Sequence, residues 1–176
     1  MRSLVGLLAL TVGLTASVTA VACWVWTARS GGPRPLRVGR QAVWVACGAA
    51  ATACTVLVSA LVTDDFSVRY VADNGARAVP LLYKVASLWA ALEGSLLLWL
   101  LVLTAFTVTV AVARVPARAA ALHPWAMVTL SVVCVAFFAL AAFAGNAFQQ
   151  VTPVPADGPG PNPLLQDHPL MAVHPP

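Results

Sequence analysis

The feature that most constrains this chain is a series of four long, largely uncharged runs separated by short polar segments. The runs cover about residues 4–27, 42–63, 85–113 and 124–144. A helix that rises about 1.5 Å per residue crosses the hydrocarbon core of a bilayer in about 20 residues. Only 9% of the residues are charged, whereas about a quarter are charged in a soluble domain. The sequence therefore predicts an all-α integral membrane protein with four transmembrane helices in residues 1–144.

The first run has a second interpretation, as a cleaved signal peptide. A processing site is faintly suggested by Ala20-Val21-Ala22. The positive region before the run is a single Arg2, however, and the apolar stretch continues through Trp26. A signal-peptide core is shorter than this. We therefore expect a retained helix.

The polar segments differ in charge, which predicts the topology. Residues 28–40 hold four arginines among Pro and Gly, and residues 114–118 hold two more around Pro116. We expect both segments to be short, non-helical basic loops. Cytoplasmic loops are rich in Arg and Lys, so the positive-inside rule predicts that both face the cytoplasm. The N-terminus, an extended or interface-lying outer loop at 64–84 and the tail would then face outward.

Composition also excludes some functions. The formal net charge of +4 does not indicate a nucleic-acid partner, because the basic residues flank apolar runs instead of forming one patch. The four cysteines lie inside apolar runs without CxxC or CxxCH spacing. A zinc site and a covalent haem attachment site are therefore not indicated, and we expect the cysteines to act as small buried hydrophobes.

Candidate site residues gather near the start of the third run. Glu93 is a carboxylate close to an apolar stretch, and ionisable groups within a membrane are functional candidates. Trp89 and Trp99 are expected to be interfacial aromatics, with Trp89 and Glu93 on one helix face. Position alone equally allows a structural carboxylate that is hydrated or paired with Lys84 or Arg77.

The tail at 145–176 is expected to be a Pro/Gly-rich extracytoplasmic loop, because seven Pro or Gly residues between 151 and 163 exclude a regular helix. His174 precedes Pro175 and Pro176, which suit the first turn of a following fifth helix. The positive end of that helix would disfavour an imidazolium and keep a nitrogen free for a metal. A surface histidine before proline is, taken alone, more often a solvated loop residue.

Two blocks of residues carry a family resemblance. The first is EGSLLLW at 93–99, preceded by LLYK at 81–84 and by Trp89; the second is NPLLQD at 162–167, followed by His174-Pro175-Pro176. The chain resembles the N-terminal portion of the CcmF/NrfE-type haem lyases of cytochrome c maturation. It departs from them at residues 90–92, which are Ala-Ala-Leu, and in a spacing one residue longer between Asp167 and His174.

The resemblance implies a haem-handling role in the bacterial inner membrane. His174 would be an axial ligand to the iron of a non-covalent haem b, and Glu93, Trp89 and Trp99 would be weaker haem-binding candidates. Implied partners are a haem chaperone, apocytochrome c, other maturation subunits and the remainder of the polypeptide or a complementary subunit. His168 is a weak second candidate ligand, and we expect it to be a surface loop residue instead, because an axial pair must approach from opposite haem faces and six residues of loop rarely allow this. The alternatives are a membrane scaffold without haem and a fragment of a transporter.

Overall fold

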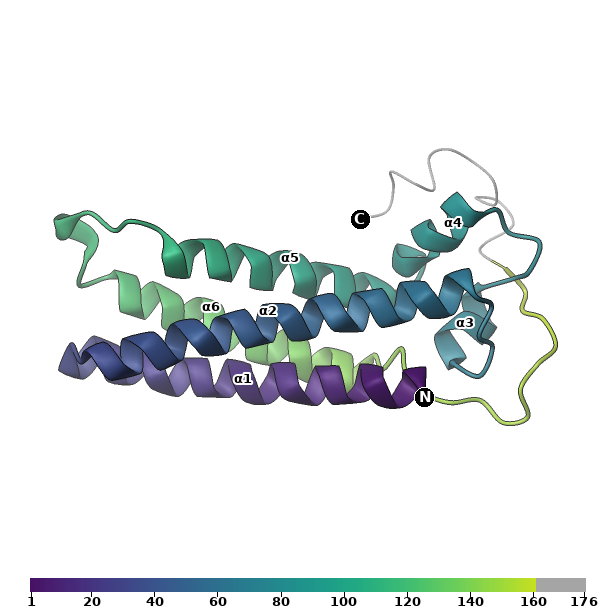
Figure 1. Ribbon diagram of the computed structural model, residues 1–176, viewed down its shortest axis with the longest axis horizontal. Coiled ribbons are helices and arrows are strands. Elements are labelled where there is room, and N and C mark those ends of the chain that lie inside the picture. The colour runs from purple at the N-terminus through teal and green to yellow at the C-terminus, as the bar shows by residue number, and fades with distance from the viewer. Residues whose placement is uncertain (161–176) are drawn as a thin grey trace.

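A computed structural model describes residues 1–160, and four long helices dominate this part of the chain. They are α1 (Arg2–Ser30), α2 (Pro33–Val62), α5 (Leu92–Val112) and α6 (His123–Ala139), the last continuing as a π-helical turn, η3 (Leu140–Ala144). Figure 1 shows them side by side in one elongated bundle. Each is long and apolar enough to cross a membrane, α6 together with η3. The predicted all-α architecture with four such helices is confirmed.

The connection between α1 and α2 is much shorter than we expected. Residues 28–40 were predicted to be non-helical, yet α2 begins at Pro33 and contains Arg34, Arg37 and Arg40. α1 ends at Ser30, because Gly31 adopts a left-handed conformation (φ 63°) and its N–H donates to Thr27 O at 2.9 Å. Proline is tolerated in the first turn of a helix, where its missing N–H would lack a partner anyway. Here proline starts a helix, and the prediction of a loop was wrong.

The predicted helix at 85–113 is interrupted. Its first part forms α4 (Leu81–Ala86) and a 3₁₀ turn, η1 (Ser87–Trp89). The backbone is then extended at Ala91 (φ −139°, ψ 168°), and α5 starts at Leu92. Trp89 and Glu93 therefore do not share a face of one continuous helix, contrary to the prediction.

The cause of this break is a tyrosine from a distant segment. The Tyr70 Oη lies 2.7 Å from Ser87 O and 3.1 Å from Leu88 O, and it accepts the N–H of Ala91 at 3.2 Å. A Cβ at Gly94 would lie 1.8 Å from Leu88 O, so only glycine fits there. Long-range hydrogen bonds and this close backbone approach override the local preference for helix.

The segment at 64–84 is only partly extended. Val68 forms an isolated antiparallel bridge with Gln150, and Arg69 N donates to Gln149 O at 2.7 Å. The short helix α3 (Arg69–Asn74) follows at once, within the segment that we expected to be extended or to lie at the interface. The bridge fixes the start of the tail against the segment between α2 and α5.

The bundle has two chemically different ends. One end, here called the loop end, comprises residues 63–91 and 145–160 with the N-terminus; the other, the arginine end, comprises residues 28–40 and 113–123. Figure 1 shows α3, α4 and residues 145–160 gathered at the loop end, opposite the α1–α2 and α5–α6 connections. The structure therefore places the N-terminus, the 64–84 segment and the start of the tail at the same end, as predicted. That this end faces outward stays a prediction.

Close packing between α1 and the C-terminal half of the chain depends on small residues. A Cβ at Gly13 would lie 2.0 Å from the ring of Phe138, and one at Gly6 would lie 2.3 Å from the ring of Phe148. Small residues that let aromatic side chains approach a helix backbone are typical of membrane helix packing. Cys54 and Cys134 are buried as expected, whereas the other two cysteines are only half-buried.

Candidate functional site

The structure describes three of the four predicted site residues. Trp89, Glu93 and Trp99 belong to η1 and α5, while His174 and the weaker candidate His168 lie outside the described residues. The third histidine, His123, lies at the arginine end, where its Nε2 is 3.0 Å from Val110 O and its ring meets Trp24 edge-on. The candidate site is therefore at the loop end.

Glu93 lies in the first turn of α5, half-buried, where the positive end of the helix favours a carboxylate. It borders a polar cleft of about 280 Å³ between α3, α5 and the start of the tail. The other lining residues are mostly polar: Arg69, Tyr70, Asp73, Asn74, Ala144, Asn146, Ala147 and Gln149. The fold thus brings α3, the start of α5 and the start of the tail together at one cleft, although Glu93 and Ala144 are 51 residues apart in the sequence (144 − 93).

The predicted partners of Glu93 are engaged elsewhere. Lys84 Nζ contacts Asp64 Oδ2 at 2.5 Å, with 11% and 23% of the two side chains exposed. The Arg77 side chain donates to Ala156 O at 3.1 Å. Glu93 has no ion pair or hydrogen bond among the described residues. It is therefore not paired with Lys84 or Arg77, and the other structural alternative, a hydrated carboxylate, stays a prediction.

The other polar groups of the cleft are already bonded. Arg69 contacts Asp73 at 3.5 Å and Gln149 Oε1 at 3.1 Å, and Asn74 Nδ2 donates to Tyr70 O at 3.1 Å. Burial raises the pKa of the Tyr70 phenol, and the nearby Glu93 charge adds to this effect. The cleft therefore presents one carboxylate that can accept a hydrogen bond or a cation. Within residues 1–160, no cluster of three His, Cys, Asp or Glu residues could hold a metal ion.

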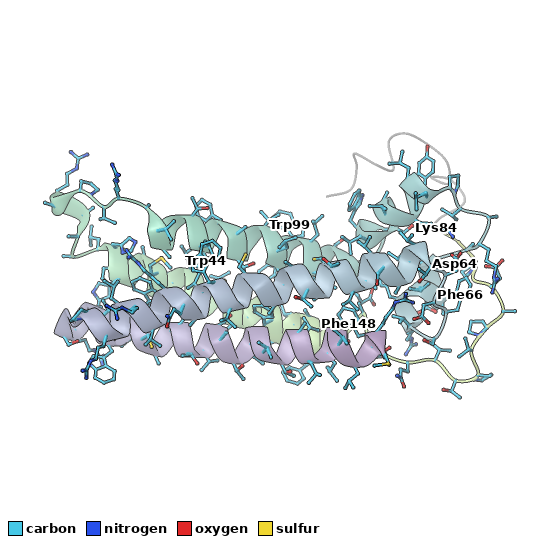
Figure 2. The ribbon with its side chains drawn as sticks, viewed as in Figure 1. Trp44, Asp64, Phe66, Lys84, Trp99 and Phe148 are labelled. Carbon is cyan, nitrogen blue, oxygen red and sulfur yellow. The ribbon has the colours of Figure 1, made fainter. Side chains whose placement is uncertain are left out.

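The two tryptophans are not brought together. Trp89 is half-buried and packs against the core, and its carbonyl accepts the Ser95 hydroxyl at 3.1 Å. Trp99 is 56% exposed, and Figure 2 shows it well along α5, away from Asp64 and Lys84. Of the two tryptophans, only Trp89 lies at the loop end, shortly before Glu93 in the sequence.

A set of ion pairs and hydrogen bonds fixes the frame of the loop end. Arg2 pairs with Asp65 at 2.9 Å, and the Ser67 hydroxyl donates to the same carboxylate at 2.5 Å. The Ser67 hydrogen bond and the Arg2 guanidinium hold the pKa of Asp65 below its usual value. Together with the pair of Lys84 and Asp64, these contacts tie α1, α2 and α4 to one another.

The start of the tail is fastened to the same frame. Arg77 N donates to Asp157 Oδ1 at 3.0 Å, and Gly160 N donates to Gly75 O at 3.0 Å. A Cβ at Gly158 would lie 2.3 Å from Gly75 O, so the two backbones touch. The backbone N–H groups of Arg77 and Gly158 lower the pKa of Asp157. Turn chemistry around Asp157 was visible in the sequence, but its partner 80 residues away was not.

Comparisons with known proteins give a consistent result. No protein-family model matches the chain. It is 36% identical over 174 residues to the cytochrome c-type biogenesis protein CcmF of Escherichia coli, covering 97% of this chain and 26% of the relative. The cytochrome c-type biogenesis protein CycK of Rhizobium meliloti is 33% identical, with 96% and 25% covered. NrfE of Haemophilus influenzae is 32% identical over 121 residues, with 69% and 19% covered.

A solved structure is similar over nearly the whole chain. It is described as cytochrome c haem lyase CcmF, and the superposition has a TM-score of 0.82 at 32% identity, covering 99% of this chain and 27% of that one. The chain thus spans about a quarter of the length of the curated relatives and of the structure that it matches.

Proposed function

This chain belongs to the CcmF/NrfE-type cytochrome c haem lyase family, and on that premise we propose that it is a haem-handling N-terminal portion of a membrane haem lyase. The lyase would attach haem to apocytochrome c in the bacterial inner membrane. In this role the loop end faces outward and the arginine end faces the cytoplasm, as the distribution of arginines favours.

The proposal rests on the attachment of the start of the tail to the loop end. Gly160 is bonded to Gly75, which follows Asn74 of the polar cleft. The described part of the tail therefore ends at the loop end, which also carries Glu93 and Trp89. A haem ligand further along the chain would follow on from this end of the bundle instead of the arginine end.

In this proposal haem b is the substrate that the protein holds, and His174 would ligate its iron. The haem supplies the reactivity, and the protein contributes binding, orientation and electrostatics. An imidazole is a common axial ligand of haem iron. Glu93 would accept a hydrogen bond or a cationic group of a partner at the mouth of the cleft, and Trp89, held by the core, would border the bound haem. Apocytochrome c, a haem chaperone and the rest of the lyase are the partners that this role requires.

The test is the haem content of the purified membrane protein that contains this chain. We expect His174→Ala to lose most of its haem absorbance. The matched control is His168→Ala, which removes a histidine from the same tail and should keep it. Equal haem content and an unchanged spectrum in the His174 variant would overturn the assignment. A reporter fusion that placed the tail in the cytoplasm would do the same.

A further inference from the structure

A groove runs along the α1–α2 pair, starting at the arginine end. Its first part is a hollow of about 560 Å³ lined by Arg34, Val38, Trp26 and neighbouring residues. A second hollow shares Val38 and extends to Val45, and a third shares Val45 and extends toward the loop end. Three adjoining hollows thus make one groove along two helices.

The walls of the groove are apolar and uncovered. The exposed fractions are 65% for Trp26, 43% for Val38 and 49% for Val45. No other helix within residues 1–160 lies over these side chains. In a membrane-spanning bundle such side chains contact lipid or another apolar partner.

The charge at the start of the groove identifies the kind of partner. All six arginines at residues 28–40 and 113–123 lie at the arginine end, and the chain has no acidic residue in either segment. Arg34 is exposed in the first turn of α2, where the helix itself contributes a positive partial charge. Arg40 Nε is buried without a partner among the described residues. The groove therefore starts at an uncompensated positive charge, which is complementary to an anion.

The part of the groove that the first two hollows form, from Arg34 to Val45, matches one leaflet of a bilayer in length. Arg34 and Val45 are 11 residues apart on α2, which is roughly 16 Å along the axis. One leaflet of the hydrocarbon core is about 15 Å thick. An acyl chain that starts below a headgroup at Arg34 would end near Val45.

We propose that this groove binds an anionic phospholipid, with its phosphate at Arg34 and an acyl chain along Val38 and Val45. Clusters of basic residues at a membrane surface attract anionic headgroups in the same way. A partner helix would also fill the apolar part, but it would leave Arg34 without a counter-charge unless it brought an acid. The inference does not depend on haem handling.

The experiment measures lipid retained by the purified membrane protein that contains this chain. The protein is exchanged into nanodiscs of phosphatidylcholine with a minor fraction of phosphatidylglycerol, and lipids bound after extraction are counted by native mass spectrometry. We expect phosphatidylglycerol to be enriched at least fivefold over its fraction in the disc. Arg34→Gln should abolish most of this enrichment.

Two further variants make the result specific. Arg118→Gln removes an exposed arginine of the same end outside the groove and should keep the enrichment, whereas Val38→Trp fills the groove and should reduce it. Soluble glycerol phosphate should not compete, because it lacks an acyl chain. Equal retention of both lipids, or equal effects of Arg34→Gln and Arg118→Gln, would overturn the proposal. Loss of a protein subunit from the Val38 variant without loss of lipid would identify a helix as the occupant and overturn it too.

Discussion

Replacing Tyr70 by phenylalanine removes the single oxygen that organises the break before α5. That oxygen contacts Ser87 O, Leu88 O and Ala91 N within 3.2 Å, and only 3% of Tyr70 is exposed. A hydrogen bond contributes about 1 kcal/mol net, and a buried group left unpaired costs about 1–3 kcal/mol. We expect Tyr70→Phe to lower the free energy of unfolding by about 2–3 kcal/mol.

The assay is equilibrium unfolding in mixed micelles, followed by helical circular dichroism. The control is Trp99→Phe, because Trp99 is 56% exposed on α5, and such a position should change stability by less than about 0.5 kcal/mol. Amide hydrogen exchange at Ala91 should also speed up in the Tyr70 variant, since its N–H loses its acceptor. If Tyr70→Phe is no more destabilising than the control, the hydroxyl does not hold the break and the reasoning fails.

Two further predictions concern the loop end. Gly94→Ala places a Cβ 1.8 Å from Leu88 O, so the backbone must move. Equilibrium unfolding in mixed micelles should show a free energy of unfolding lower by about 3 kcal/mol or more. A decrease below about 1 kcal/mol would contradict this. The Ser67 hydroxyl and Arg2 lower the pKa of Asp65. The ionised Asp65 therefore stabilises the fold fully above its usual pKa of 3.8, and this stabilisation is lost as the pH falls through the lower pKa of the folded state. The free energy of unfolding should fall with decreasing pH below about 3.8 in the wild type and fall less in Asp65→Asn. The same pH dependence in both proteins would count against a stabilising contact between Asp65 and Arg2.

The fold was largely predictable because membrane helices depend on length and hydropathy more than on partners. Near Pro33 and Ala91, length and hydropathy no longer predict the structure. Proline begins a helix or interrupts one according to what precedes it, and here a glycine with φ 63° closes α1 just before it. The break at Ala91 depends on a hydroxyl 21 residues away, and local propensity contains no information about such a contact.

The contacts around the candidate residues could not be predicted from the sequence, and the role of these residues stays a prediction. Glu93 and Trp89 were visible as a carboxylate and an aromatic beside an apolar run. That Lys84 pairs with Asp64 instead of Glu93 follows from the break before α5 and from the left-handed turn at Asp64 (φ 55°), neither of which has a local signal. His174, outside the described residues, remains a prediction.

The pairing pattern at the loop end bears on how a ligand could be held there. Arg2, Lys84 and Arg69 each have an acidic partner, and Arg77 bonds to the tail. Three of these four cations are therefore neutralised by acids, the Arg77 side chain meets a carbonyl, and Glu93 is among the carboxylates of the described loop end that form no ion pair. Under the proposed function, an anionic ligand such as haem would find little net attraction from this surface, so its binding would come from iron ligation and apolar contact. Under the proposed function, the affinity for haem depends on one imidazole and should respond little to salt, whereas lipid binding at the unpaired arginines should weaken with it.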